Sequence, residues 1–274
     1  MKTELVKALD FELVTQPAAY FHNGEVRLSS KHQLISRSND GTPLSVMGSN
    51  YHPMLVSHFE ESTQRLSEIS GYPIVGYQQF QEGRVILSFL ENTRKQEAAG
   101  FPIGDYIVVG SSVDGTRPFF VGTSTILIRC TNAFSQINTI ERVKHTKSAP
   151  VRLEKLYSYF NEYVNGREKL YTDFEEMTEF KITDAVRDEF AKFMIEAPEG
   201  QEIGTRKSKR LLELIDCIRV ESADVGKNVF GLFQGVTKFT THNLQSTQGT
   251  FGSVLGQRAW MNQRAYNRCL EYIR

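Results

Sequence analysis

Two kinds of hydrophobic pattern divide the chain, and this division limits its fold more than any other feature. Up to residue 145, short runs rich in Ile, Val, Tyr and Phe alternate with turn signals, which is typical of antiparallel hairpins. Beyond residue 145, apolar residues recur at three- and four-residue spacing, which is typical of amphipathic helices. Strands followed by helices predict an α+β protein rather than a doubly wound parallel sheet.

Turn signals place the hairpins of the first half. Asn39-Asp40-Gly41, Gln81-Glu82-Gly83 and Asp114-Gly115 each separate two strand-like runs. One covering helix is expected between the first two hairpins, where Ser57 and Glu60 have the spacing of a capping box and Gly71 is suited to end the helix.

The second half is expected to be helical. Its apolar stripes predict helices at 150–166, 183–198, 211–218, 229–239 and 255–273. The stretches 197–209 and 245–252 are rich in Gly, Pro or small polar residues and are expected to be mobile loops. We predict a single domain over 1–274, β-rich over 1–145 and helical over 146–274.

Composition favours a cytoplasmic protein. The start of the chain lacks the uninterrupted apolar stretch of a secretory signal, and the apolar runs are too short to span a membrane. The three cysteines are widely spaced and odd in number, which favours reduced, buried thiols over a disulfide framework. We therefore expect no membrane association.

The sequence shows no pattern that indicates an enzyme. Phosphate-binding glycine loops and paired Cys or His ligand motifs are absent, so no cofactor and no metal are expected. Cys130 precedes His145 by only fifteen residues, but it ends an apolar strand, where a buried thiol is the usual occupant. We expect a binding protein without catalytic residues.

Net charge is zero, but it is the sum of unlike segments. Residues 129–159 carry +4, residues 160–202 carry −7, residues 203–274 carry +6 and residues 1–128 carry −3. A neutral protein with this segregation can still present a basic surface, although the charges can also cancel in space.

Two basic stretches are the candidate nucleic-acid-binding sites. The first runs from the end of a predicted strand to the start of the helix after Pro150, and the second lies at a predicted loop-to-helix junction. Lysine and arginine bind phosphates by releasing counterions, and a helix N-terminus also favours anions. The candidate residues are Arg129, Arg142, Lys144, His145, Lys147, Arg152 and Lys155 in the first stretch, and Arg206, Lys207, Lys209 and Arg210 in the second.

Four stretches in fixed order carry a resemblance to a known family. They are Ile35-Ser36-Arg37 through Tyr51-His52-Pro53, Ile128-Arg129-Cys130-Thr131-Asn132-Ala133-Phe134, Val143-Lys144-His145-Thr146, and Asn228-Val229-Phe230-Gly231 through Phe251-Gly252-Ser253. The chain resembles the phage- and plasmid-type family called domain of unknown function 932. The resemblance implies a role in mobile genetic elements, such as replication, recombination or anti-restriction, and supplies no catalytic residues.

Two functions are favoured at this point, ahead of an enzyme that would use Cys130, His145 or His242 in a cleft. The first is a phage- or plasmid-encoded nucleic-acid-binding protein that binds or anneals single-stranded DNA in recombination, with bases stacked on aromatic side chains and several copies assembled on one strand. The alternative is a protein-interaction factor, such as an inhibitor of a host defence enzyme, whose acidic block over 162–202 docks a basic host protein.

Overall fold

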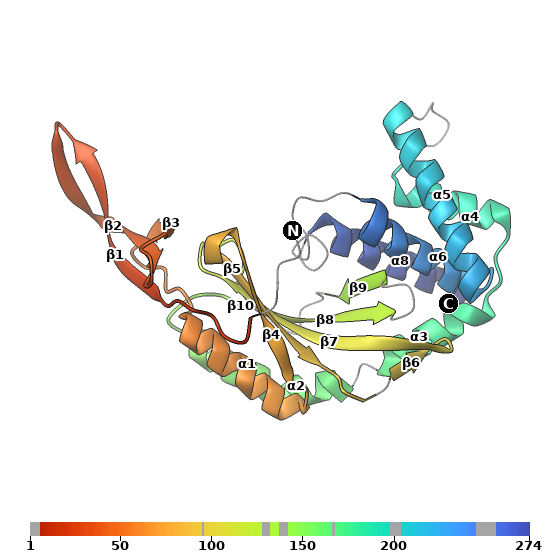
Figure 1. The fold of residues 1–274 in the computed structure, drawn as a ribbon, viewed down its shortest axis with the longest axis horizontal. Coiled ribbons are helices and arrows are strands. Elements are labelled where there is room, and N and C mark those ends of the chain that lie inside the picture. The colour runs from red at the N-terminus through yellow and green to blue at the C-terminus, as the bar shows by residue number, and fades with distance from the viewer. Residues whose placement is uncertain are drawn as a thin grey trace.

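The computed structural model describes residues 6–94, 96–127, 132–136, 142–165, 168–197, 204–244 and 256–274. Two antiparallel sheets and one helix come first along the chain, and the second half is largely helical (Figure 1). The predicted α+β class is therefore confirmed. Within the described ranges, no helix is both long and apolar enough to cross a membrane.

The larger sheet is built from the hairpins that the turn signals predicted. Its strands are ordered β10-β8-β7-β5-β4, and each pairing is antiparallel. Two short strands extend it toward the helical half, β6 beside the start of β7 and β9 beside the end of β8. The bounds are β4 (Ile74–Phe80), β5 (Val85–Glu91), β6 (Gln96–Ala98), β7 (Phe101–Ser112), β8 (Phe119–Leu127), β9 (Asn132–Gln136) and β10 (Arg142–Val143).

A smaller sheet carries a long hairpin that projects from the body of the molecule (Figure 1). Its strands are β1 (Leu13–His22), β2 (Glu25–Arg37) and β3 (Pro43–Gly48), in that order. Asn23 and Gly24 form the tight turn at its tip with positive φ angles of 52° and 81°, a conformation that suits a two-residue hairpin loop. The sequence predicted the pairing of β2 with β3 but not β1 or the outer part of β2.

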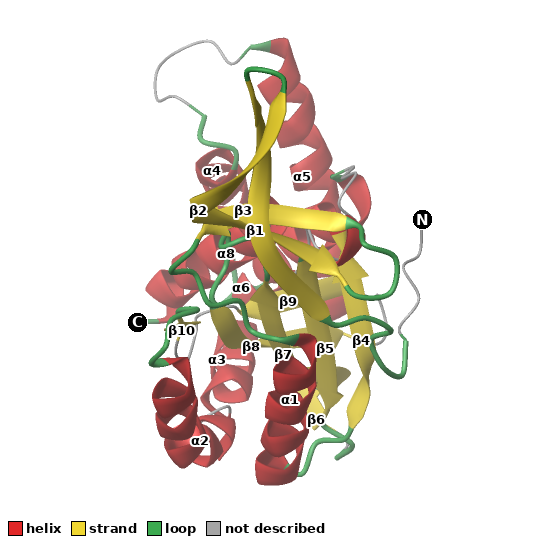
Figure 2. Ribbon diagram, turned by 90° about the vertical axis from the view of Figure 1, so that its left-hand side faces the viewer, coloured by secondary structure: helices red, strands yellow, loops and turns green. Residues whose placement is uncertain are grey.

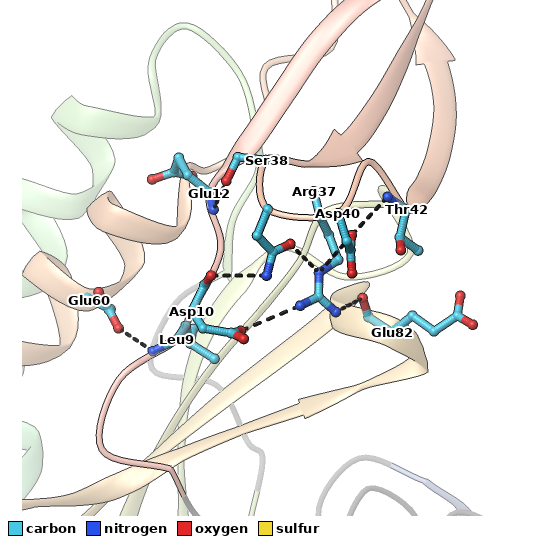
Figure 3. Close-up of polar contacts among 10 residues, drawn as sticks. Leu9, Asp10, Glu12, Arg37, Ser38, Asp40, Thr42, Glu60 and Glu82 are labelled. Carbon is cyan, nitrogen blue, oxygen red and sulfur yellow. Dashed lines mark hydrogen bonds and ion pairs between the residues drawn. The ribbon is translucent and has the colours of Figure 1, made fainter.

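Arg37 anchors the base of this hairpin (Figure 3). Its guanidinium lies 3.5 Å from a carboxylate oxygen of Asp10 and 3.6 Å from one of Asp40, and it donates a 3.5 Å hydrogen bond to the backbone carbonyl of Glu82. The guanidinium also stacks 4.6 Å above the ring of Phe11. These contacts connect the projecting hairpin to the large sheet.

The helix α1 (Val56–Ser70) is capped differently from the prediction. Ser57 and Glu60 do not form a capping box, because the carboxylate of Glu12 accepts hydrogen bonds from the backbone N–H groups of Val56 and Ser57 at 2.7 and 2.9 Å. Glu60 instead accepts from the backbone N–H of Leu9 at 2.9 Å (Figure 3). Partial burial works against ionisation of Glu12, but the backbone N–H donors lower its pKa overall.

The helices lie in two groups, each around its own hydrophobic cluster. The helices α1 and α2 (Ala149–Asn165) lie side by side over one face of the large sheet (Figure 2), where Phe59, Leu66 and Phe160 are fully buried. The second cluster lies around Phe230 and Phe233. It is enclosed by α3 (Glu168–Glu179), α4 (Asp184–Met194), α5 (Thr205–Val225), α6 (Val229–Lys238) and α8 (Gln257–Ile273).

Candidate functional site

The segment that begins with β10 presents charges on one side and a buried wall on the other. β10 pairs with the start of β8, with Arg142 opposite Phe120 and Val143 opposite Phe119. Extended backbone sends successive side chains to opposite sides, so Arg142 and Lys144 are exposed whereas Val143 and His145 are buried. The first predicted basic stretch therefore contributes to two adjoining features, a cationic surface and a cavity.

The cationic surface is formed by side chains that follow one another from just before β8, through β10, to the first two turns of α2. We call it the cationic edge, and its members are Arg117, Arg142, Lys144, Lys147, Arg152 and Lys155. The last five are exposed, and none of them forms an ion pair with a residue that the structure describes. Their charges are therefore available to an external anion.

Two arginines of the cationic edge lie close enough to repel each other. Partial burial lowers the pKa of the Arg117 guanidinium, and the positive charge of Arg142 lowers it further, while Asp114 acts in the opposite direction. Both groups remain charged at neutral pH because an arginine ionises only far above it. A bound anion would relieve this repulsion.

A cavity of about 530 Å³ lies behind the cationic edge, between α1 and α2. Its apolar wall includes Phe119, Val143 and Leu153, and its polar groups include His58 and Glu61. Both helices, the loop before α1 and the segment after β10 contribute to it. The full lining is His52, Pro53, Met54, His58, Glu61, Ser62, Arg65, Phe119, Val143, His145, Thr146, Lys147, Ala149, Pro150, Leu153, Glu154 and Tyr157.

His145 lines this cavity, is largely buried, and lies within hydrogen-bond distance of two hydroxyl groups. Its Nδ1 lies 2.8 Å from the Tyr51 hydroxyl and its Nε2 lies 3.2 Å from the Ser111 hydroxyl. Burial lowers the pKa of His145 to about 4, and burial raises the pKa of Tyr51 to about 12. Both side chains are therefore neutral at pH 7, and His145 differs from its cationic neighbours in offering no charge to a ligand.

An ion pair joins the two helices that form the cavity. Arg65 on α1 binds both carboxylate oxygens of Glu154 on α2 at 2.5 and 2.8 Å, and its guanidinium stacks 4.2 Å above the ring of Tyr157. The pair is largely exposed, so its contribution to stability is small. Its bidentate geometry nevertheless fixes the spacing of α1 and α2 at the cavity.

The structure does not bring the second basic stretch to the cationic edge. Arg206, Lys207, Lys209 and Arg210 are exposed in the first two turns of α5, at the tip of the helical half, whereas β10 and α2 lie at the opposite side of the molecule (Figures 1 and 2). The expected loop over 197–209 is wrong from residue 205 onward, because the helix begins at Thr205.

The cations of α5 also differ in their partners. Lys207 donates a 2.9 Å hydrogen bond to the backbone carbonyl of Glu196, and Lys209 lies 4.0 Å from Glu213 one turn along the helix. Arg129 and the expected loop over 245–252 lie outside the described residues, as does Cys130.

Several members of the site were not predicted from the sequence. Arg117 lies beside Arg142 only because of the pairing of β8 with β10, and Tyr51 reaches His145 across 94 positions of sequence. The hairpin signal at Asp114-Gly115 placed Arg117 at the start of a strand, which is the only local signal for it.

Two of the three cysteines, Cys217 and Cys269, lie in the part of the chain that the structure describes. Cys217 and Cys269 are buried, and burial raises the pKa of both thiols, that of Cys217 to about 11. Such thiols remain protonated and unreactive at neutral pH. Within the described ranges, no group of three His, Cys, Asp or Glu side chains is arranged to hold a metal ion.

Comparison with known proteins identifies the family. A family model described as "Domain of unknown function (DUF932)" matches residues 43–266, which include α1, the large sheet, the cavity and most of the helical half. No curated protein and no solved structure gives a significant match. Since the match covers well over half of the chain, the protein belongs to the DUF932 family.

Proposed function

We propose that the protein binds single-stranded nucleic acid, with single-stranded DNA as the favoured ligand, and that the cationic edge contacts its phosphates. The observation that carries the proposal is that Arg142, Lys144, Lys147, Arg152 and Lys155, close together along the chain, are all exposed and form no ion pair with a described residue. Like charges held together on a surface cost free energy unless an anion binds there, and a phosphate backbone supplies a row of anions.

The acidic block behaves differently, which favours this function over a docking site for a basic protein. Four of its twelve acids are paired with basic residues, three of which lie outside the block, so part of its charge cancels in space. The pairs are Asp184 with Arg187 and Lys227, Asp188 with Arg187, Glu189 with Arg268 and Glu196 with Arg264. The sequence segment with the largest net negative charge is thus less negative as a surface than its composition indicates.

Contacts with the bases, in addition to contacts with the phosphates, complete the proposed binding mode. Sequence-independent binding of single strands combines phosphate contacts with stacking of bases on side chains. One copy of the edge offers few cations, so several copies along a strand would strengthen the binding of a phage- or plasmid-encoded recombination protein. The assignment to recombination rests on the resemblance drawn from the sequence.

A salt series measured by fluorescence anisotropy tests the proposal. The ligand is a labelled single-stranded oligonucleotide of roughly 20 nucleotides, and a duplex of the same length is the comparison. If about four phosphates are contacted, the slope of log affinity against log salt is near −3, so affinity falls by about 50-fold between about 50 and 200 mM salt. Absence of binding at the lowest salt would refute the proposal, and stoichiometric capture of a host protein without nucleic acid would then favour the interaction factor.

A further inference from the structure

The cavity between α1 and α2 adjoins the cationic edge and has no place yet in the proposed function. We propose that it binds one unstacked nucleoside unit, base inward, of the strand whose phosphates lie on the cationic edge. This inference rests on the proposed function for its strand, but the cavity can also be tested with ligands that carry no phosphate.

The alternation of exposed and buried side chains in the segment that begins with β10 places the cavity next to the cationic edge. Val143 and His145 line the cavity, while Arg142 and Lys144, which alternate with them along the chain, are exposed. Lys147 belongs to both features, since it is a cation of the edge and also lines the cavity. A strand held by these cations therefore lies beside the mouth of the cavity.

The size and lining of the cavity suit a planar, neutral ring. Its volume of about 530 Å³ is within the range of about 300–1,000 Å³ found for small-molecule sites, so a base with its sugar can enter. Pro53, Met54 and Leu153 are partly exposed and supply apolar surface for the ring face. The imidazole of His58 and the carboxylate of Glu61 supply polar groups for its edge.

The charges of the cavity select the base rather than the phosphate. Glu61 lines the cavity and forms no ion pair with a described residue, and the carboxylate of Glu154 is paired with Arg65. A phosphate drawn inside would face the Glu61 carboxylate, whereas the same carboxylate can accept a hydrogen bond from a base. Apart from Lys147, the unpaired cations of the edge do not line the cavity, so the phosphates would remain outside it.

A single strand can place a base in the cavity at low cost. Removing a base from a duplex requires breaking its pairing and stacking, which costs a few kcal/mol, but an unpaired base loses only its stacking. Stacking on protein side chains returns a comparable free energy per base. The arrangement therefore favours single strands over duplexes for the same number of phosphate contacts.

The test compares a base-containing oligonucleotide with an abasic deoxyribose-phosphate oligomer of equal length, using the parent protein and two tryptophan variants. Thr146 is exposed and lines the cavity, so Thr146→Trp fills the mouth without disturbing the core. Val151 is 73% exposed on α2 and does not line the cavity, so Val151→Trp is the matched control. Circular dichroism melting curves establish that both variants are folded.

We expect the parent and Val151→Trp to bind the base-containing strand about tenfold more tightly than the abasic strand. We expect Thr146→Trp to bind both strands with the affinity that the parent has for the abasic one. Equal affinity of the parent for the two strands, or an unchanged preference in Thr146→Trp, would overturn the inference while leaving phosphate binding by the cationic edge intact.

Free deoxynucleosides provide a second readout that does not depend on the cationic edge. In saturation-transfer NMR, the base protons of deoxycytidine and deoxyadenosine should receive magnetisation from the parent and from Val151→Trp but not from Thr146→Trp. If no oligonucleotide binds, the proposed function fails, and this readout alone decides whether the cavity binds a base. Absence of transfer from the parent would overturn the inference.

Discussion

Protonation of His145 should destabilise the protein as the pH falls, because the folded chain holds this imidazole in its neutral form. The side chain is 9% exposed, with its two nitrogens hydrogen-bonded to Tyr51 and Ser111. Burial is the main cause of its low pKa, and the charge of Asp114 offsets only part of the effect. The pKa is about 4 in the folded state, compared with 6.5 for an unperturbed histidine.

The direction and size of the effect follow from these two values. Above pH 6.5 the imidazole is neutral in both states and does not affect stability. As the pH falls below 6.5, only the unfolded chain takes up the proton, so the free energy of unfolding falls by about 1.4 kcal/mol per pH unit until the folded pKa is reached. Between about pH 7 and pH 5 the loss from this residue is about 2 kcal/mol.

The assay compares urea unfolding of the parent with that of His145→Gln, which cannot titrate. Other groups titrate in both proteins, so their contributions cancel in the difference between the two free energies of unfolding. We expect the stability advantage of the parent to shrink by about 2 kcal/mol from about pH 7 to pH 5. Parallel curves over this range would refute the assignment of a buried, neutral His145.

Two further predictions concern the helical half. Lys238→Met leaves the Glu221 carboxylate, which is 2% exposed and now 2.9 Å from Nζ of Lys238, buried without its partner. We expect the free energy of unfolding, measured by chemical denaturation, to fall by about 3 kcal/mol in Lys238→Met and to be partly restored in the double variant Lys238→Met, Glu221→Gln. Equal stability of the single and the double variant would contradict this. Gly235→Ala places a Cβ 2.5 Å from the backbone Cα of Ile218. The free-energy cost of this steric overlap between α6 and α5 should exceed the gain of about 1 kcal/mol in helix propensity. We therefore expect a lower melting temperature, and a raised one would contradict the packing.

Local sequence signals were sufficient for most of the fold within the described residues. Turn signals at Asn39-Asp40-Gly41, Gln81-Glu82-Gly83 and Asp114-Gly115 each lie between paired strands, because such turns are determined by a few residues. Thr183 caps α4 by accepting a hydrogen bond from the backbone N–H of Val186, at the start of the helix that the apolar stripe over 183–198 predicted.

The projecting hairpin could not be predicted from periodicity. Apolar alternation marks a strand when one of its faces is buried, but most of β1 and the outer part of β2 are exposed. The helix α3 was not among the predicted helices either, but here periodicity could have revealed it. Its buried residues Leu170, Phe174 and Met177 have helical spacing, so a signal was present within a strongly acidic segment.

The candidate site was predictable only in part because it depends on long-range pairing. The run from Arg142 to Lys155 is a basic stretch in the sequence, and the structure keeps most of it exposed beside the start of α2. Its alternation with a cavity wall depends on where β10 pairs, and the cavity itself requires α1 and α2 to lie together. Charge counts along the chain gave no indication of which acidic and basic residues pair.

The most direct test of the proposed function compares the salt dependence of oligonucleotide binding in two double variants. Arg142→Ala with Lys144→Ala removes two cations of the cationic edge, and Lys207→Ala with Lys209→Ala removes two from the start of α5. Each lost phosphate contact on a single strand reduces the magnitude of the slope of log affinity against log salt by about 0.7. The slope of the edge variant should therefore be smaller by about 1.4, and the α5 variant should have the slope of the parent. An unchanged slope in the edge variant, or a loss confined to the α5 variant, would contradict binding at the cationic edge.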